Sequence, residues 1–350
     1  MRLARHLLTR TYRYLRGEVL VLPSRTAALV FCVGLLMVPL FMRHPYYLRM
    51  LILASIFALF AASWDLLSGY TGQMNFGHAL FFGVAAYSAA LLNIHTPLPP
   101  PLTIPLGAIA AVAAGLVVGV PCLRLRGPYL ALATLAFPII LTAIVFAFPD
   151  TTGGELGVWG IDKLSGSRVT DYYICVSVML ALGFVMWKLG NSKTGMIFHA
   201  IREDEIAARM SGINTTRYRL VAFSLSALFA GVAGGLYAHF MRVAGPSSLD
   251  VMLSFQVIIW AVVGGMGTIY GPIAGAFGLY LLTEWLRIVP ETRNLIFAVV
   301  VLVVLLIMPE GLTTWARDRI ERDCPRCKMK NLVVRRSCRV CEAALGETGA

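Results

Sequence analysis

The stretch GYTGQMNFGHALFFGVAAYSAALL at residues 69–92 joins a polar, glycine-rich half to an apolar half. Its first nine residues include Gly69, Gly72 and Gly77, and Gln73 and Asn75 lie between them, with His78 next. The remainder is typical of a membrane-spanning helix. Unwound backbone at membrane depth is tolerated only where protein buries it or where it lines a watery cavity. The stretch therefore predicts a broken segment beside the path of a substrate or solvent.

The composition indicates a polytopic membrane protein. The chain has 350 residues, of which 58% are hydrophobic and 14% charged, whereas soluble domains carry about 25% charged residues. The net charge of +12 does not indicate nucleic-acid binding, because nine of the 30 Lys and Arg lie in the last 34 residues and six in the first 25. Such placement sets membrane topology.

Apolar runs long enough to span a bilayer predict an all-α bundle of about ten transmembrane helices. We expect a basic amphipathic N-terminus at 1–25, a transmembrane domain at 26–312 and a basic tail at 313–350. Ten spans and the positive-inside rule predict that both termini are cytoplasmic. The predicted spans are 26–42, 50–68, 73–93, 103–123, 127–148, 172–190, 217–240, 251–270, 272–289 and 293–309.

A second glycine-broken segment lies at residues 260–277, WAVVGGMGTIYGPIAGAF, and contains Gly264, Gly265 and Gly267. Interrupted apolar segments in the two halves of a transporter indicate a midplane binding site. Asp65, just before the first segment, is read either as a functional residue or as a group solvated at the interface.

The loop at 191–219 is predicted to hold a short amphipathic helix at 201–213, with Glu203, Asp204 and Glu205 in its first turns. An apolar stripe follows, and Gly212 is a plausible stop signal. Such a helix fits the groove of a second protein or rests on its own membrane face.

Three stretches together resemble the permease subunits of bacterial ABC importers of the branched-chain amino acid family. They are residues 69–92, AIREDEIAARMSGINTTRYRLVAFSLSALFAGVAGGLYA at 200–238 and VVGGMGTIYGPIAGAFGLYLL at 262–282. The resemblance covers about residues 50–312. Urea and short-amide importers have very similar permeases.

The resemblance implies a subunit of the bacterial inner membrane that imports a small polar molecule by alternating access driven by separate ATPase subunits. The expected cargo is a branched-chain amino acid (leucine, isoleucine or valine), with urea or a short-chain amide as the alternative. The resemblance also implies a second homologous permease, two cytoplasmic ATP-binding subunits and a periplasmic or external substrate-binding protein. The 201–213 helix is similar to the coupling helix that docks into the ATPase, with Glu203, Asp204, Ala207, Ala208 and Gly212 at the site. Gln73, Asn75 and His78 would then lie near the translocation path, although His78 is equally read as a helix-packing residue.

The sequence contains no G-x-x-x-x-G-K-[ST] phosphate loop, so we expect no bound nucleotide and no ATP hydrolysis by that route in this chain. A self-sufficient secondary transporter or channel is the rival reading, and it would require intramembrane acids for ion coupling, which are few here. A membrane sensor with an output tail is a third.

The tail carries CxxC, ten residues and a second CxxC, formed by Cys324, Cys327, Cys338 and Cys341. Two such knuckles can hold one tetrahedral metal ion, and Zn²⁺ in a structural role fits best. Iron is the minor option. The tail lies outside the resemblance.

Overall fold

The computed structural model describes residues 23–42, 44–122, 125, 127–289, 291–327, 330–333, 337–338, 340–341 and 343. Most of the predicted basic N-terminal segment, residues 1–22, lies outside them. The chain forms two compact units, one of residues 42–311 and one of residues 1–41 with 312–350.

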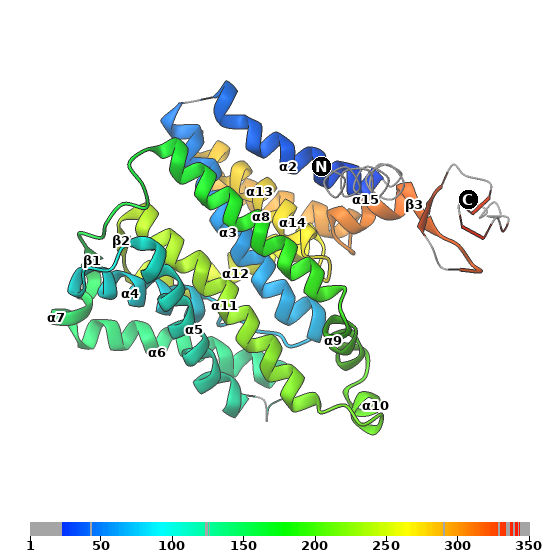
Figure 1. Ribbon diagram of the computed structural model, residues 1–350, viewed down its shortest axis with the longest axis horizontal. Coiled ribbons are helices and arrows are strands. Elements are labelled where there is room, and N and C mark those ends of the chain that lie inside the picture. Colours follow the sequence, from blue (N-terminus) through cyan, green and yellow to red (C-terminus); the bar gives the residue numbers. More distant parts are fainter. Residues whose placement is uncertain are drawn as a thin grey trace, which may run out of the picture. The chain divides into compact units, whose positions relative to one another are not determined.

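The larger unit is helical (Figure 1). Its helices are α3 (Pro45–Thr71), α4 (Ala79–His95), α5 (Pro100–Cys122), α6 (Pro128–Ala147), α7 (Pro149–Thr152), α8 (Arg168–Gly190), α9 (Lys193–Glu203), α10 (Glu205–Met210), α11 (Thr215–Met241), α12 (Val251–Gly264), α13 (Tyr270–Trp285) and α14 (Arg293–Ile307). Short 3-10 turns lie at Gly154–Leu156, Pro246–Leu249 and Leu286–Ile288, and β1 (Val158–Trp159) pairs antiparallel with β2 (Val243–Ala244).

The smaller unit contains α2 (Pro23–Phe41), α15 (Leu312–Ile320) and a two-stranded antiparallel sheet. The sheet pairs β3 (Glu321–Asp323) with β4 (Lys330–Leu332), and Glu321 lies opposite Leu332. Arg319 lies over the ring of Trp315, 4.2 Å from its centroid.

The prediction of a helical polytopic membrane protein is confirmed. Each predicted span contains a helix, and six ranges are long and apolar enough to cross a membrane: Pro45–Thr71, Pro100–Cys122, Pro128–Ala147, Arg168–Gly190, Thr215–Met241 and Arg293–Ile320. One span starts later than predicted, because residues 73–78 are not helical and α4 begins at Ala79. The predicted spans 251–270 and 272–289 are separate helices with a break between them.

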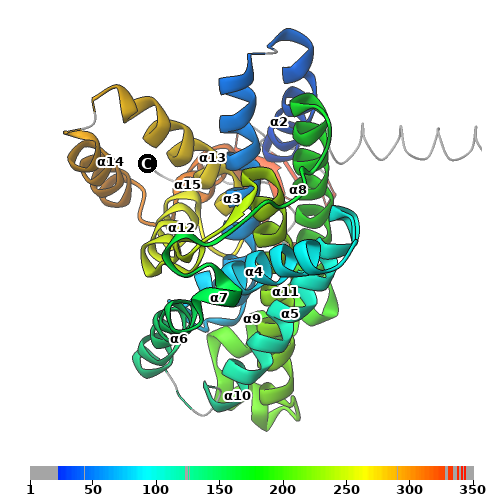
Figure 2. The same cartoon turned by 90° about the vertical axis from the view of Figure 1, so that its left-hand side faces the viewer.

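Helix α3 is the centre of the larger unit, and it packs against α8, α11 and α13. All its residues from Ile52 to Thr71 except Phe57 are buried. Helices α6 and α14 are much less covered and lie toward the outside in Figure 2. Their outward apolar side chains, such as Ile139 and Leu302, suit a hydrocarbon environment.

Small residues allow the inner helices to approach closely. A Cβ on Gly231 would lie 2.8 Å from the Cα of Ala108, and a Cβ on Gly115 would lie 3.0 Å from the Cβ of Ala227. A close approach also joins α12 to α13, where a Cβ on Gly264 would lie 2.1 Å from the carbonyl oxygen of Gly271.

The change Gly264→Ala should therefore destabilise the α12–α13 pair, by about 1–3 kcal/mol for an overpacked contact. We expect a lower midpoint of thermal unfolding for the detergent-solubilised protein. Gly278→Ala in α13 is the matched control, since its added Cβ would meet nothing within 4 Å. Equal midpoints for the two variants would contradict the packing described here.

Candidate functional site

The first break follows α3. Gly72 ends this helix in the left-handed conformation, with φ +70°, and its backbone N–H donates to the carbonyl of Ser68. Glycine adopts this conformation without the steric cost of a Cβ. The chain then runs without helix through residues 73–78 until α4 begins. The predicted interruption is present. It lies between two separate helices, α3 and α4, and is not the first part of one helix.

The polar side chains of this break are buried and hold its shape. His78 is fully buried, and its Nε2 lies 2.9 Å from the Ser63 hydroxyl. The indole N–H of Trp64 donates to the carbonyl of Asn75 over 2.7 Å, and the Asn75 side-chain oxygen accepts from the N–H of Gly77. The geometry of His78 is that of a helix-packing histidine with a polar partner.

Gln73 differs from its neighbours in having a spare acceptor. Its Nε2 donates to the Thr71 hydroxyl over 2.9 Å, while its side-chain oxygen is buried without a hydrogen-bond partner among the described residues. Buried acceptors are normally paired with protein or water. The Gln73 oxygen is thus a group that a polar ligand or water can satisfy.

The second break lies between α12 and α13. Gly265 and Gly267 have φ of +114° and +78°, and Ile269 has φ +55°. Positive φ is uncommon for any residue but glycine and is a clear outlier for a β-branched one, so surrounding contacts must hold Ile269 there. A helix cannot continue through these conformations, which explains why one apolar stretch becomes two helices.

Asp65 of α3 supplies those contacts. Its Oδ1 accepts from the Gly267 N–H at 2.7 Å and its Oδ2 from the Ile269 N–H at 3.2 Å. Asp65 has 0% exposed surface, so the interpretation that its side chain is solvated at the membrane interface is wrong. A Cβ on Gly69 would lie 2.0 Å from the same Oδ1, so only glycine leaves room for the carboxylate. Asp65 therefore joins the second break to the last turns of α3, just before the first break.

The predicted helix at 201–213 is wrong at its start. Helix α9 ends at Glu203, Asp204 is extended, and α10 covers only Glu205–Met210. The Asp204 carboxylate accepts from the N–H groups of Ile206 and Ala207, at 2.8 and 3.0 Å. Aspartate is a strong N-cap, so it begins a new helix instead of continuing the old one. Gly212, with φ +83°, follows the end of α10 as predicted.

Helix α10 presents apolar side chains outward. Ile206 is 60% exposed and Met210 83%, whereas Ala208 is buried. Glu205 forms an ion pair with Arg209 of the same helix, at 2.8 Å. It also lies 3.4 Å from Arg219, and this second ion pair fixes α10 to α11. The result is a small, anchored projection with an uncovered apolar surface.

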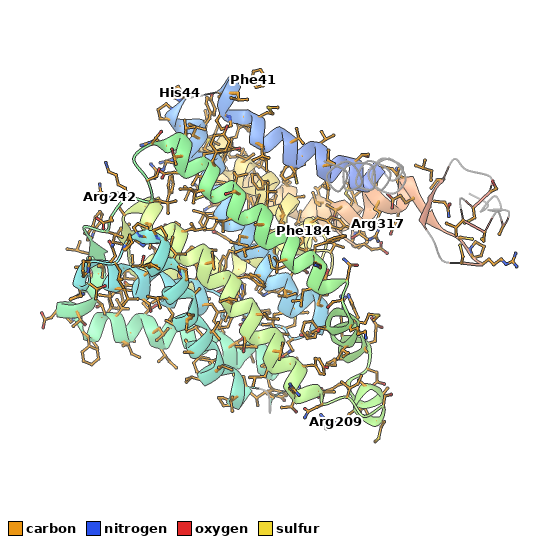
Figure 3. The ribbon with its side chains drawn as sticks, viewed as in Figure 1. Phe41, His44, Phe184, Arg209, Arg242 and Arg317 are labelled. Carbon is orange, nitrogen blue, oxygen red and sulfur yellow. The ribbon has the colours of Figure 1, made fainter. Side chains whose placement is uncertain are left out.

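A cationic cavity of about 490 Å³ lies at the other end of the bundle from α10. Figure 3 shows Arg242 at this end and Arg209 at the opposite one. Arg242, with φ +60°, donates to the carbonyl of Ile161, and Arg168 donates to that of Pro45. This cavity was not predicted from the sequence, because its basic residues lie in segments far apart along the chain. Its charged lining comprises Arg49, Lys163, Arg168, Arg242 and Asp171.

The four tail cysteines come together in the smaller unit. Their sulfur atoms all lie within 4.8 Å of one another, with Cys324 and Cys341 3.6 Å apart and Cys327 and Cys338 3.5 Å apart. Hydrogen bonds from the backbone of Cys341 and then Val340 lower the pKa of the Cys338 thiol to about 6. Low pKa values favour the thiolate, the form that binds metals. The four residues could hold a metal ion.

Comparisons with known proteins agree with this architecture. Residues 46–308 match the family described as branched-chain amino acid transport system / permease component. The matched range contains both breaks, α9 and α10. The chain is a multi-pass membrane protein that belongs to this permease family.

Two relatives carry the name high-affinity branched-chain amino acid transport system permease protein LivM. The one from Escherichia coli K12 is 30% identical over 80% of this chain and 71% of its own length. The one from Salmonella typhimurium is 28% identical over 91% of this chain and 84% of its own. The permease protein LivH of Escherichia coli K12 is 26% identical over 77% of this chain and 94% of its own. No solved structure matches.

Proposed function

We propose that this chain is a permease subunit of an ABC importer that carries branched-chain amino acids across the bacterial inner membrane. The observation that carries the proposal is the family match over residues 46–308, together with relatives named for this transport. Both termini are cytoplasmic in this proposal, because the basic residues gather at the two ends of the chain.

The cargo path runs beside the two breaks. Gly72 interrupts the first segment and Gly265 and Gly267 the second, through their positive φ, while Gly69, Gly77 and Gly264 leave room for close contacts beside the breaks. Gln73, Asn75 and His78 form the polar side of the first break. The uncommitted oxygen of Gln73 supports contact with a polar cargo. An interior with few charges suits a zwitterionic amino acid.

Helix α10 is the part that docks on the ATPase. Its exposed Ile206 and Met210 suit insertion into an apolar groove. Asp204 caps it, Gly212 ends it, and Ala207 and Ala208 keep it thin, while Glu203 closes the preceding helix. Because Glu205 ties α10 to Arg219 of α11, a push on the helix reaches the bundle.

The remaining partners follow from this role. Two ATP-binding subunits hydrolyse ATP, a second homologous permease completes the pathway, and the bilayer covers the apolar outer helices. An external binding protein delivers the cargo. The cavity lined by Arg49, Arg168 and Arg242 supports docking of a protein with acidic side chains at that end.

The tail holds a structural Zn²⁺ ion on Cys324, Cys327, Cys338 and Cys341. Zinc–sulfur bonds of about 2.3 Å in a tetrahedron place the sulfurs about 3.8 Å apart, and the sulfur distances of 3.5 and 3.6 Å are close to this value. The metal would cross-link β3, β4 and the following turns, which are too short to form an apolar core of their own.

Elemental analysis of the purified full chain should find about one zinc per chain. The change Cys338→Ser should remove most of it, because three thiolates no longer close the tetrahedron. Cys32→Ser, which alters a cysteine of α2, is the matched control and should retain the metal. Iron in place of zinc would correct the metal assignment, and equal metal in both variants would refute the site.

Uptake of labelled leucine by cells with and without this gene tests the transport role. We expect uptake to fall on deletion, to return with the wild-type gene, and to be inhibited by unlabelled isoleucine but not by urea or acetamide. Unchanged leucine uptake would contradict the cargo assignment. Loss of urea or amide uptake instead would assign the chain to that kind of importer, and uptake independent of ATP would favour a secondary transporter or channel.

A further inference from the structure

Helix α9 is anchored against the end of α3 where the first break begins. Phe198 and Ile201 of α9 are buried. The rings of His199 and Tyr70 lie 4.8 Å apart, which places α9 beside the last turn of α3. A Cβ on Gly195 would lie 1.9 Å from the Gly190 carbonyl, so the turn between α8 and α9 is also tight. Displacement of α9 therefore displaces its neighbours.

Arg202, in the last turn of α9, reaches both breaks. Its Nη1 donates to the carbonyl of Gly69. A Cβ on Gly72 would lie 3.3 Å from the Arg202 Cγ, and a Cβ on Gly267 would lie 3.1 Å from its Nη1. One side chain thus lies along the first break and touches the second, although residues 69, 202 and 267 are far apart in the sequence.

The Asp65 carboxylate and the Arg202 side chain both lie against Gly267 of the second break. A carboxylate buried in a transmembrane helix is costly unless donors and positive charge surround it. The amides of Gly267 and Ile269 supply the donors, and the guanidinium of Arg202, which lies beside Gly267, supplies a nearby positive charge. Asp65 and Arg202 together connect α3, the second break and α9.

The contact of Arg202 with α3 precedes Asp204 in the sequence, and the attachment of α10 to α11 follows it. Glu205, one residue after Asp204, binds Arg219, and Arg202, two residues before it, binds the Gly69 carbonyl. The extended Asp204 therefore lies between an ion pair that holds α11 and a hydrogen bond that reaches the breaks. A force on α10 has two separate routes into the bundle.

We propose that Arg202 is a positioning residue that couples movement of the α9–α10 loop to both glycine breaks, through the Gly69 carbonyl and through Gly267, whose N–H Asp65 holds. This inference rests on the proposed role as an ATP-driven permease. Arg202 does not touch the cargo in this arrangement. It holds the breaks in register with the loop, so its loss should uncouple ATP hydrolysis from transport and leave cargo delivery intact.

The test uses the complete transporter, reconstituted in vesicles with its partner permease, ATPases and binding protein. For Arg202→Gln we expect the maximal rate of leucine uptake to fall by at least about tenfold, a usual size for a lost coupling, while the KM for the loaded binding protein stays within about twofold. ATP hydrolysis continues, so the ATP used per leucine rises. Arg202→Lys keeps the charge and should recover part of the uptake.

Arg217→Gln, which removes an exposed arginine at the start of α11, is the matched control and should behave as wild type. A parallel fall of uptake and ATP hydrolysis, or unchanged uptake, in Arg202→Gln and Arg202→Lys would overturn the inference. Absence of ATP-driven leucine uptake by the wild-type complex would contradict the proposed function instead.

Discussion

The buried carboxylate of Asp65 is the constraint on which the interior of the larger unit depends. It accepts from Gly267 and Ile269, in the break between α12 and α13. Without those bonds, two backbone N–H groups would be buried without acceptors, and nothing would offset the cost of a β-branched residue at positive φ. The carboxylate in turn needs the space that Gly69 leaves. One acid in α3 therefore fixes where the second apolar stretch breaks and how closely the break approaches the first.

The loop between α8 and α11 extends this arrangement to the surface. Asp204 divides the loop into α9, which is packed on α3, and α10, whose apolar side chains point outward. A six-residue helix is not stable by itself, because isolated helices of this length are marginal in water. The Asp204 cap and the Glu205–Arg219 ion pair stabilise it. A short helix held in this way can receive force from a partner without unfolding first.

Much of this could be predicted from the sequence, because apolar length and glycine position act locally. The helical spans, an interruption in the polar stretch that begins at residue 69 and the stop at Gly212 were predicted, although the span after the interruption was started six residues too early. The separate α9 and α10 were missed, since three consecutive acids suit a first helical turn as well as an N-cap. The contact between Asp65 and Gly267, 202 residues apart, leaves no local pattern. The same is true of the cavity around Arg242, which forms only when α3, α8 and α11 meet.

Hydrogen exchange in the assembled transporter tests the central claim, that the Asp65-bound break moves with the ATPase cycle. Peptides covering residues 264–270 should be compared between the nucleotide-free complex and the complex locked with ATP, with peptides from the tightly packed 231–235 segment of α11 as reference. The account predicts a change of at least about tenfold in exchange at 264–270 and little change in the reference. Equal exchange at 264–270 in the two states would contradict it.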